Sequence, residues 1–135
     1  DVVFTLSPRL GIQVAGTPAL DLVNRGCHLC DDFPCVTVCE PDALTLPDAE
    51  GSTAPVLARM SINEDTCLPF LGPECGGCEG SCPVTGALTW SAARPSIDPA
   101  RCTGCAMCRA ACILDESAIG VASVHAEYPV HISSA

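Results

Sequence analysis

Short apolar runs flank three cysteine-rich loops in this chain, and a similar pattern recurs from loop to loop. Residues 60–63 (Met-Ser-Ile-Asn) precede one loop, and residues 95–98 (Pro-Ser-Ile-Asp) precede another. Related runs follow the loops at residues 42–45, 86–89 and 117–120. A pattern that recurs along a chain indicates a repeated structural unit. The sequence therefore predicts a unit of a short strand, a cysteine loop, one helical turn and a second short strand.

The apolar runs are too short to cross a membrane. A membrane-spanning helix needs about 18 or more apolar residues in succession. The longest candidate, residues 10–23, is interrupted by Gln13, Pro18 and Asp21. The chain opens at Asp1, and no signal peptide is recognisable in the sequence. We therefore expect no direct membrane span.

Twelve cysteines, arranged as three groups of four, carry the candidate chemistry. The first quartet is Cys27, Cys30, Cys35 and Cys39; the second is Cys67, Cys75, Cys78 and Cys82; the third is Cys102, Cys105, Cys108 and Cys112. The third quartet has the Cys-x2-Cys-x2-Cys-x3-Cys spacing of ferredoxin iron–sulfur ligands. We expect all twelve cysteines to bind iron, as thiolate ligands of about three 4Fe-4S clusters.

This spacing has a physical basis. A loop of the form Cys-x2-Cys-x2-Cys can wrap around one cubane-shaped cluster and reach three of its iron corners. The fourth cysteine faces away from that cluster, and in two-cluster ferredoxins it ligates the other one. A proline such as Pro83 after the fourth cysteine would end the helical turn there, because proline has no N–H to donate.

Two other uses of clustered cysteines agree less well with the spacing. A disulfide framework usually links distant loops, whereas the third quartet lies within residues 102–112. Structural zinc uses two Cys-x2-Cys pairs separated by a loop, typically of about 15–20 residues. In the third quartet another cysteine follows the first pair at once, so a single zinc ion would have redundant donors. Iron–sulfur clusters fit best, with structural zinc as the alternative.

Composition favours a fold organised around such clusters. The 135 residues include one Trp, one Tyr and three Phe, and alanine and cysteine make up much of the 48% hydrophobic share. So little large apolar surface offsets chain entropy poorly, and we expect no stable fold without metal. The predicted class is α+β, with ferredoxin-like repeats of short β-hairpins, through turns such as residues 47–51, and single-turn helices wrapped around iron–sulfur clusters.

The charge balance indicates the kind of partner. Sixteen acidic residues face six basic ones, all arginine, which gives a formal net charge of -10. Each four-thiolate cluster in its oxidised form would add about two negative charges. Nucleic acid and anionic lipid repel such a chain, whereas a basic surface on a redox protein attracts it. Solubility is an equally ordinary reason for the acidic residues.

Three segments carry a family resemblance. They are residues 27–35 (Cys-His-Leu-Cys-Asp-Asp-Phe-Pro-Cys), residues 67–72 (Cys-Leu-Pro-Phe-Leu-Gly) and residues 102–105 (Cys-Thr-Gly-Cys). Over residues 16–121 the chain resembles the ferredoxin-type NapG/MauM family, accessory electron-transfer proteins of periplasmic nitrate reduction and methylamine oxidation. The Cys-x2-Cys-x4-Cys-x3-Cys quartet also resembles iron–sulfur subunits of molybdenum oxidoreductases. Family members typically carry four cysteine motifs, and this chain has three.

The resemblance implies a location and a domain plan. A NapG/MauM-like protein would work on the periplasmic side of the membrane, and otherwise the chain would be cytoplasmic. We expect an N-terminal extension at residues 1–26, a polycluster ferredoxin-like domain at residues 27–123 and a C-terminal tail at residues 124–135.

The resemblance also implies how the loops exchange ligands. In the related subunits the middle two motifs pair with each other. Transferred here, Cys82 would complete the first quartet's cluster and Cys39 the second quartet's, and the third quartet would use a missing motif or Cys112. In the competing scheme, Cys112 completes the second loop's cluster and Cys82 the third loop's. The sequence leaves both schemes open.

Other residues in and near the loops have both a functional and an ordinary interpretation. Residues 68–71 form an apolar insert that either covers a cluster or contacts a partner subunit. We expect His28 to donate to a sulfur or a backbone oxygen, although it could bind iron or carry a proton. Glu40 and Asp42 would lower a nearby reduction potential, or they are solvated surface acids.

These features predict an electron-transfer protein, a subunit that passes electrons between partners in a larger redox complex and turns over no substrate itself. An accessory protein that helps to mature a redox enzyme has the same sequence features. A cluster enzyme fits less well, because complete quartets leave no open iron corner. The chain also lacks a glycine-rich nucleotide loop and a Ser/His/Asp constellation.

Overall fold

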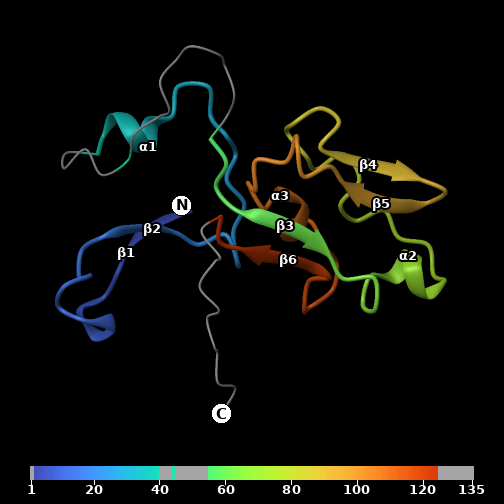
Figure 1. The fold of residues 1–135 in the computed structure, drawn as a ribbon, viewed down its shortest axis with the longest axis horizontal. Helices are drawn as coiled ribbons and strands as arrows, with labels where there is room; N and C mark the ends of the chain where they lie inside the picture. The colour runs from blue at the N-terminus through green and yellow to red at the C-terminus, as the bar shows by residue number, and fades with distance from the viewer. Residues whose placement is uncertain (1, 40–43, 45–54, 125–135) are drawn as a thin grey trace.

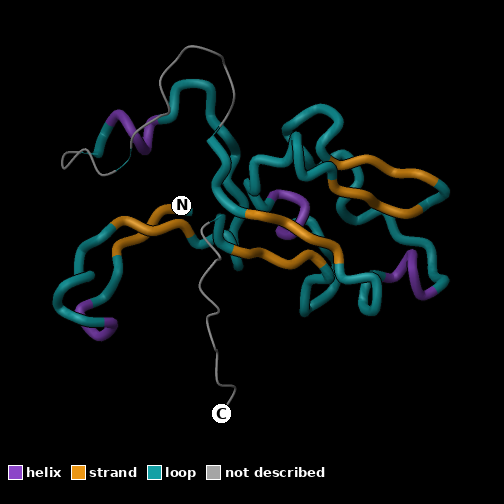
Figure 2. The backbone as a smooth tube through the Cα atoms, in the orientation of Figure 1, coloured by secondary structure: helices purple, strands orange, loops and turns teal. Residues whose placement is uncertain are grey.

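The structure is a computed structural model that describes residues 2–39, 44 and 55–124. Short strands and single helical turns alternate along this part of the chain, a mixed α+β content (Figures 1 and 2). None of its helices has the length and hydropathy to cross a bilayer. In chain order the elements are β1 (Val3–Thr5), the 3-10 turn η1 (Pro8–Leu10), β2 (Pro18–Leu20), α1 (Pro34–Thr37), β3 (Arg59–Ile62), α2 (Leu68–Leu71), β4 (Leu88–Ser91), β5 (Arg94–Ile97), α3 (Met107–Ala110) and β6 (Ile119–Ala122).

The strands pair in a nested order that folds the second and third repeats onto each other. Strands β4 and β5 form an antiparallel hairpin, with Leu88 opposite Ile97. Strands β3 and β6 also pair antiparallel, with Ile62 opposite Ile119, although they are far apart in the sequence. The strand before the second quartet thus pairs with the strand after the third (Figure 1). The prediction of hairpins is confirmed for β4–β5 and wrong for β3–β6, which is a long-range pair.

The β4–β5 turn differs in chemistry from the turns that the sequence suggested. Its two central residues are Ala92 and Ala93, with φ angles of 49° and 61°. Positive φ at both central positions is typical of a type I′ turn, for which Asn and Gly are the usual residues. The predicted turn at residues 47–51 lies outside the described residues, as does the predicted strand at residues 42–45 except for Leu44.

The interior has few large side chains. In the described residues the buried hydrophobic positions are four alanines, four cysteines, one leucine and one isoleucine: Ala58, Ala87, Ala106, Ala118, Cys67, Cys78, Cys105, Cys108, Leu22 and Ile119. Alanine contributes little apolar area, and fully burying one large aliphatic side chain stabilises by only about 1.5–3 kcal/mol. The cysteine loops are therefore packed inside the fold, with little hydrophobic core around them.

The N-terminal segment is attached to the third loop. Strands β1 and β2 pair with each other, and Leu22, after β2, packs against Ala58 and Ala106. The Cys27 N–H donates to the Cys105 carbonyl at 2.6 Å. These contacts hold the first cysteine loop beside the third.

Candidate metal centres

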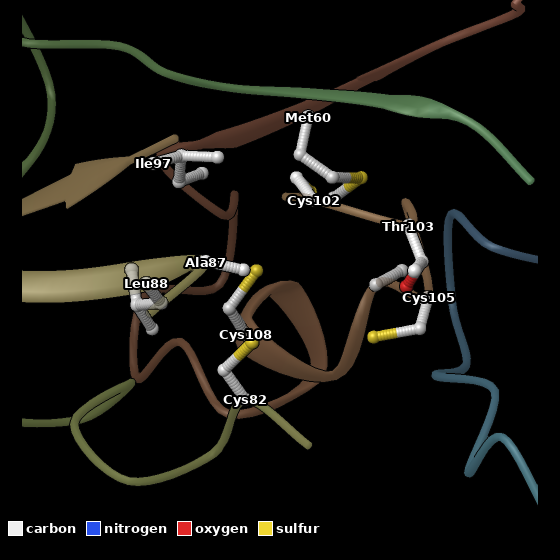
Figure 3. Close-up of a pocket in the computed structure, with 10 residues that line it drawn as sticks. Met60, Cys82, Ala87, Leu88, Ile97, Cys102, Thr103, Cys105 and Cys108 are labelled. Atoms are coloured by element: carbon white, nitrogen blue, oxygen red, sulfur yellow. The ribbon is translucent and has the colours of Figure 1, made fainter. Parts of the chain in front are cut away.

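Four cysteines from two different quartets line one cavity. They are Cys82 of the second quartet and Cys102, Cys105 and Cys108 of the third (Figure 3). We call this set the third-loop site. Its other walls are mostly apolar and come from β3, β4, β5 and the third loop: Met60, Ala87, Leu88, Ile97, Thr103 and Ala106. The sulfurs in this cavity are therefore surrounded mostly by apolar side chains.

The third loop wraps around its cavity because two of its residues adopt left-handed backbone angles. Gly104 has φ 71° and Ala106 has φ 61°. Glycine adopts such angles without a steric penalty, whereas alanine does so at a cost that the surrounding structure must offset. Helix α3 begins directly after Ala106 and carries Cys108 into the site.

The second loop forms an equivalent set with Cys112. Burial raises the pKa of the Cys67 thiol, and the nearby charges of Cys112 and then Cys75 raise it further. Burial likewise raises the pKa of Cys78 to about 11, with contributions from the same neighbours. We call Cys67, Cys75, Cys78 and Cys112 the second-loop site.

Close backbone packing brings Cys112 to this loop. A Cβ atom at Gly77, between Cys75 and Cys78, would lie 3.0 Å from Ile113 Cγ2 and 3.2 Å from the Ala111 carbonyl oxygen. A glycine at this position therefore lets the second loop approach the residues on both sides of Cys112.

The structure thus places Cys82 beside the third loop and Cys112 beside the second, which is the placement that the competing scheme requires. The exchange implied by the resemblance, in which Cys82 serves the first quartet and Cys39 the second, would need Cys82 near the first loop, whereas Cys82 lines the third-loop cavity. The nested strand pairing places the second and third repeats face to face and so brings the cysteines of these two repeats together. Helix α1, which carries Cys35, lies well away from β4, β5 and α2 (Figure 1).

The thiols in these sites are buried, and their negative charges would repel one another. Burial raises the pKa of Cys108 to about 12, with repulsion from Cys105 as the next cause. Burial also raises the pKa of Cys105, against the lowering effect of hydrogen bonds from the backbone at Met107 and from the Thr103 side chain. Thiolates gathered in this way need a positively charged group at their centre, which iron ions would supply.

Cys112 has a different environment. Burial alone would raise its pKa, but hydrogen bonds from the backbone at Leu114, the Ser117 side chain and the backbone at Ala118, with the charge of Arg109, lower it overall. These donors favour the thiolate form of Cys112.

A cluster and a single ion require different donor geometries. In the described part of the chain, no group of three or more His, Cys, Asp or Glu side chains could hold one metal ion. Zinc requires its donors within about 2.0–2.3 Å of a common centre, whereas a cluster binds each thiolate at a separate iron corner. The third-loop site has four thiols around a shared cavity.

The first quartet is only partly assembled. Cys27 and Cys35 line an apolar cavity that contains no cysteine of another quartet, and Cys30 is exposed. The loop nevertheless has left-handed residues at Leu29 (φ 50°) and Phe33 (φ 40°). Leu29 is two residues after Cys27, and Phe33 is two residues before Cys35. Gly104 and Ala106 have the same positions relative to Cys102 and Cys108. The first loop therefore has the backbone form of a ligand loop.

The apolar insert of the second loop is the single-turn helix α2. Pro69 is buried in it and Leu71 is 57% exposed. The Arg94 guanidinium lies over the Phe70 ring, 5.2 Å from its centre. The insert thus has a packed side and an exposed side. The helical turn expected just before Pro83 is wrong, because the second repeat forms its helix inside the ligand loop.

Three residues beside the sites were missed by reasoning from cysteine spacing. Trp90 Nε1 and Thr103 Oγ1 are buried without an ordinary hydrogen-bond partner. Arg109 Nε donates to the Val23 carbonyl at 2.7 Å, and its Nη1 donates to the Ile119 carbonyl. A lone tryptophan in an aromatic-poor chain, and an arginine directly after a ligand cysteine, were the available signals. His28 is exposed, and Glu40 and Asp42 lie outside the described residues.

Comparison with known proteins identifies the class. The methylamine utilization ferredoxin-type protein MauM of Methylobacillus flagellatus is 31% identical over 78% of this chain and 49% of its own length. The ferredoxin-type protein NapG of Escherichia coli is 30% identical over 79% of this chain and 52% of its own length. Formate hydrogenlyase subunit 2 of Escherichia coli is 34% identical over 55% of this chain and 29% of its own length. No protein-family profile matches the chain, and no solved structure matches it.

Three cysteine quartets and these relatives define the class as ferredoxin-type iron–sulfur proteins of electron transport. Within that class, the chain is related to the ferredoxin-type NapG/MauM family, as its cysteine loops predicted. The chain spans about half the length of the MauM and NapG relatives that it matches.

Proposed function

We propose that this chain is an electron carrier that binds 4Fe-4S clusters at its cysteine quartets. Two clusters lie in a ferredoxin-like unit made by the second and third repeats, and a third lies at the first quartet. The observation that carries the proposal is that Cys82 lies beside the third loop and Cys112 beside the second. In two-cluster ferredoxins the fourth cysteine of each motif ligates the other motif's cluster.

When bound, each cluster accepts and releases one electron. The chain's residues hold the four thiolates of each set, and the apolar side chains Met60, Leu88 and Ile97 keep water from the third-loop site. The charge interaction of Cys78 with Cys108 indicates that the two sites lie close together. Close sites suit electron transfer from one to the next within this unit.

The third cluster is supported by the backbone form of the first loop, which repeats the left-handed positions of the third loop. Cys27, Cys30 and Cys35 would supply three ligands there. The fourth is either Cys39 or a cysteine of another motif, since Cys82 belongs to the third-loop site. The full count is then about three clusters, with all twelve cysteines as ligands.

The role in a complex is supported by the relatives. Formate hydrogenlyase subunit 2 is by name a component of a larger enzyme, and NapG and MauM are by name ferredoxin-type proteins. This chain would pass electrons between redox proteins, as a subunit of such an assembly, and turn over no substrate itself. An acidic chain fits a partner with a basic docking surface.

Three serine variants test the ligand assignment. Cys82→Ser should perturb the cluster of the third-loop site, and Cys112→Ser that of the second-loop site. Cys39→Ser is the matched control, because it ligates neither site in the proposed arrangement. Electron paramagnetic resonance of the reduced proteins would report each change. Loss of the second-loop signal in Cys39→Ser, with Cys112→Ser unchanged, would contradict the proposal.

A further inference from the structure

Two buried polar atoms in the described residues lack a nitrogen or oxygen partner: Trp90 Nε1 has no hydrogen-bond partner, and Thr103 Oγ1 has none besides the Cys105 sulfur. Buried tryptophan N–H and threonine O–H groups normally find an acceptor, because an unpaired buried donor is costly. One lies beside the second-loop site and the other inside the third-loop site. This distribution indicates that the acceptor for each donor lies on the cofactor that the neighbouring cysteines would bind.

The position of Trp90 follows from strand β4. Side chains alternate across a strand, so Leu88 and Trp90 share its inner face while Thr89 and Ser91 are exposed. Trp90 lines a pocket with Cys75 and Gly76 of the second loop. It also packs against the buried core group of Cys78, Cys108 and Ile119, which contains one cysteine of each site. The pocket shared with Cys75 therefore places Trp90, whose N–H is buried, beside the second loop.

The position of Thr103 follows from the third loop, between Cys102 and Cys105. Its carbonyl accepts the Leu57 N–H at 2.7 Å, which fixes the backbone at this point. The side chain is 7% exposed, and it lines the cavity with the sulfurs of the third-loop site (Figure 3). Its hydroxyl lies near the Cys105 sulfur and is otherwise unpaired.

We infer that Trp90 Nε1–H donates a hydrogen bond to a sulfur of the cluster in the second-loop site, and that Thr103 Oγ1–H does so in the third-loop site. Each bond raises the reduction potential of its own cluster. The inference rests on the proposed clusters. A donor to sulfur stabilises the reduced cluster more than the oxidised one, because the reduced form carries one more negative charge. One electron enters each cluster from the titrant, and no proton is transferred.

Reciprocal variants test this assignment. Trp90→Phe removes the N–H and keeps an aromatic ring, and Thr103→Val removes the hydroxyl and keeps the shape. Reductive titration of purified protein with dithionite, followed by electron paramagnetic resonance, should show a lower midpoint for the second-loop cluster alone in Trp90→Phe. It should show a lower midpoint for the third-loop cluster alone in Thr103→Val. Thr103→Ser should restore the parental value.

The inference would be overturned if neither variant changed a midpoint potential, or if each variant shifted the potentials of both clusters together. If a variant loses its cluster, the inference is tested on the unsubstituted protein instead. Electron–nuclear double resonance spectra recorded in H2O and in D2O are compared. An exchangeable proton coupled to each reduced cluster is expected, and absence of such protons would contradict the assignment. Iron and sulfide analysis of the parent separates the two claims. Missing clusters refute the proposed function, whereas intact clusters with unmoved potentials refute only the two hydrogen bonds.

Discussion

Replacing Gly104 by alanine should destabilise the third-loop site more than any other glycine replacement at a similar backbone angle. Gly104 has φ +71°, and a Cβ atom there would lie 2.0 Å from the Ala58 carbonyl oxygen and 2.4 Å from the Ala58 nitrogen. Both are backbone atoms, and the Leu57 N–H bond to the Thr103 carbonyl holds the two segments together. No side-chain rotation can relieve this contact.

Gly80 supplies the matched control. It lies in the second ligand loop with φ +72°, and a Cβ atom there would meet nothing within 4 Å. Left-handed angles cost an L-residue roughly 1–2 kcal/mol, and overpacking adds about 1–3 kcal/mol. Gly80→Ala should therefore cost about 1–2 kcal/mol and Gly104→Ala about 2–5 kcal/mol. The difference between the variants isolates the contact with Ala58.

The assay is anaerobic denaturant titration, followed by the visible absorbance of the bound clusters. Gly104→Ala should lose its clusters at a clearly lower denaturant concentration than Gly80→Ala, or fail to load the third-loop site. Equal midpoints for the two variants would refute the close approach of the third loop to Ala58.

Three further outcomes are expected. Arg109→Gln should destabilise the protein by about 2 kcal/mol, because it removes charge-assisted hydrogen bonds to the Val23 and Ile119 carbonyls. In measurements of thermal cluster loss, Arg109→Lys should recover little of this stability. Full recovery would mean that the charge alone matters. Extraction of iron by a chelator should unfold the chain, because the described core is mostly alanine and cysteine; the emission of Trp90 should shift to the red, and an unchanged spectrum would contradict this. The protein should co-purify with a redox partner and exchange electrons with it at a rate that depends weakly on salt; a free monomer with a steep salt dependence would indicate transient docking by its acidic surface.

Cysteine spacing predicted the chemistry of the site because ligand loops are local in sequence. The loop from Cys102 to Cys108 is compact enough for its spacing to define how it wraps. The short strands were also visible as recurring apolar runs. The α+β content and the relationship to NapG and MauM followed from the same patterns.

The partner of each loop was not predictable in this way, because it depends on long-range strand pairing. Cys82 lies beside the third loop in a fold in which β3 pairs with β6 and β4 pairs with β5. Short strands carry too little sequence information to specify a partner. The second repeat also forms its helix within the insert at Leu68–Leu71, a departure that the repeat pattern concealed. The position of Trp90 beside the second loop depends on the face of β4 that it occupies, and this can be known only from the fold.

The central claim is that the twelve cysteines bind iron–sulfur clusters, and metal content tests it most directly. Iron, acid-labile sulfide and zinc should be quantified on protein purified without oxygen. The account predicts about twelve iron and twelve sulfide per chain, from three clusters of four, and no stoichiometric zinc. About eight of each would mean that the first quartet, which is only partly assembled, binds no cluster within this chain. Stoichiometric zinc without sulfide would contradict the account.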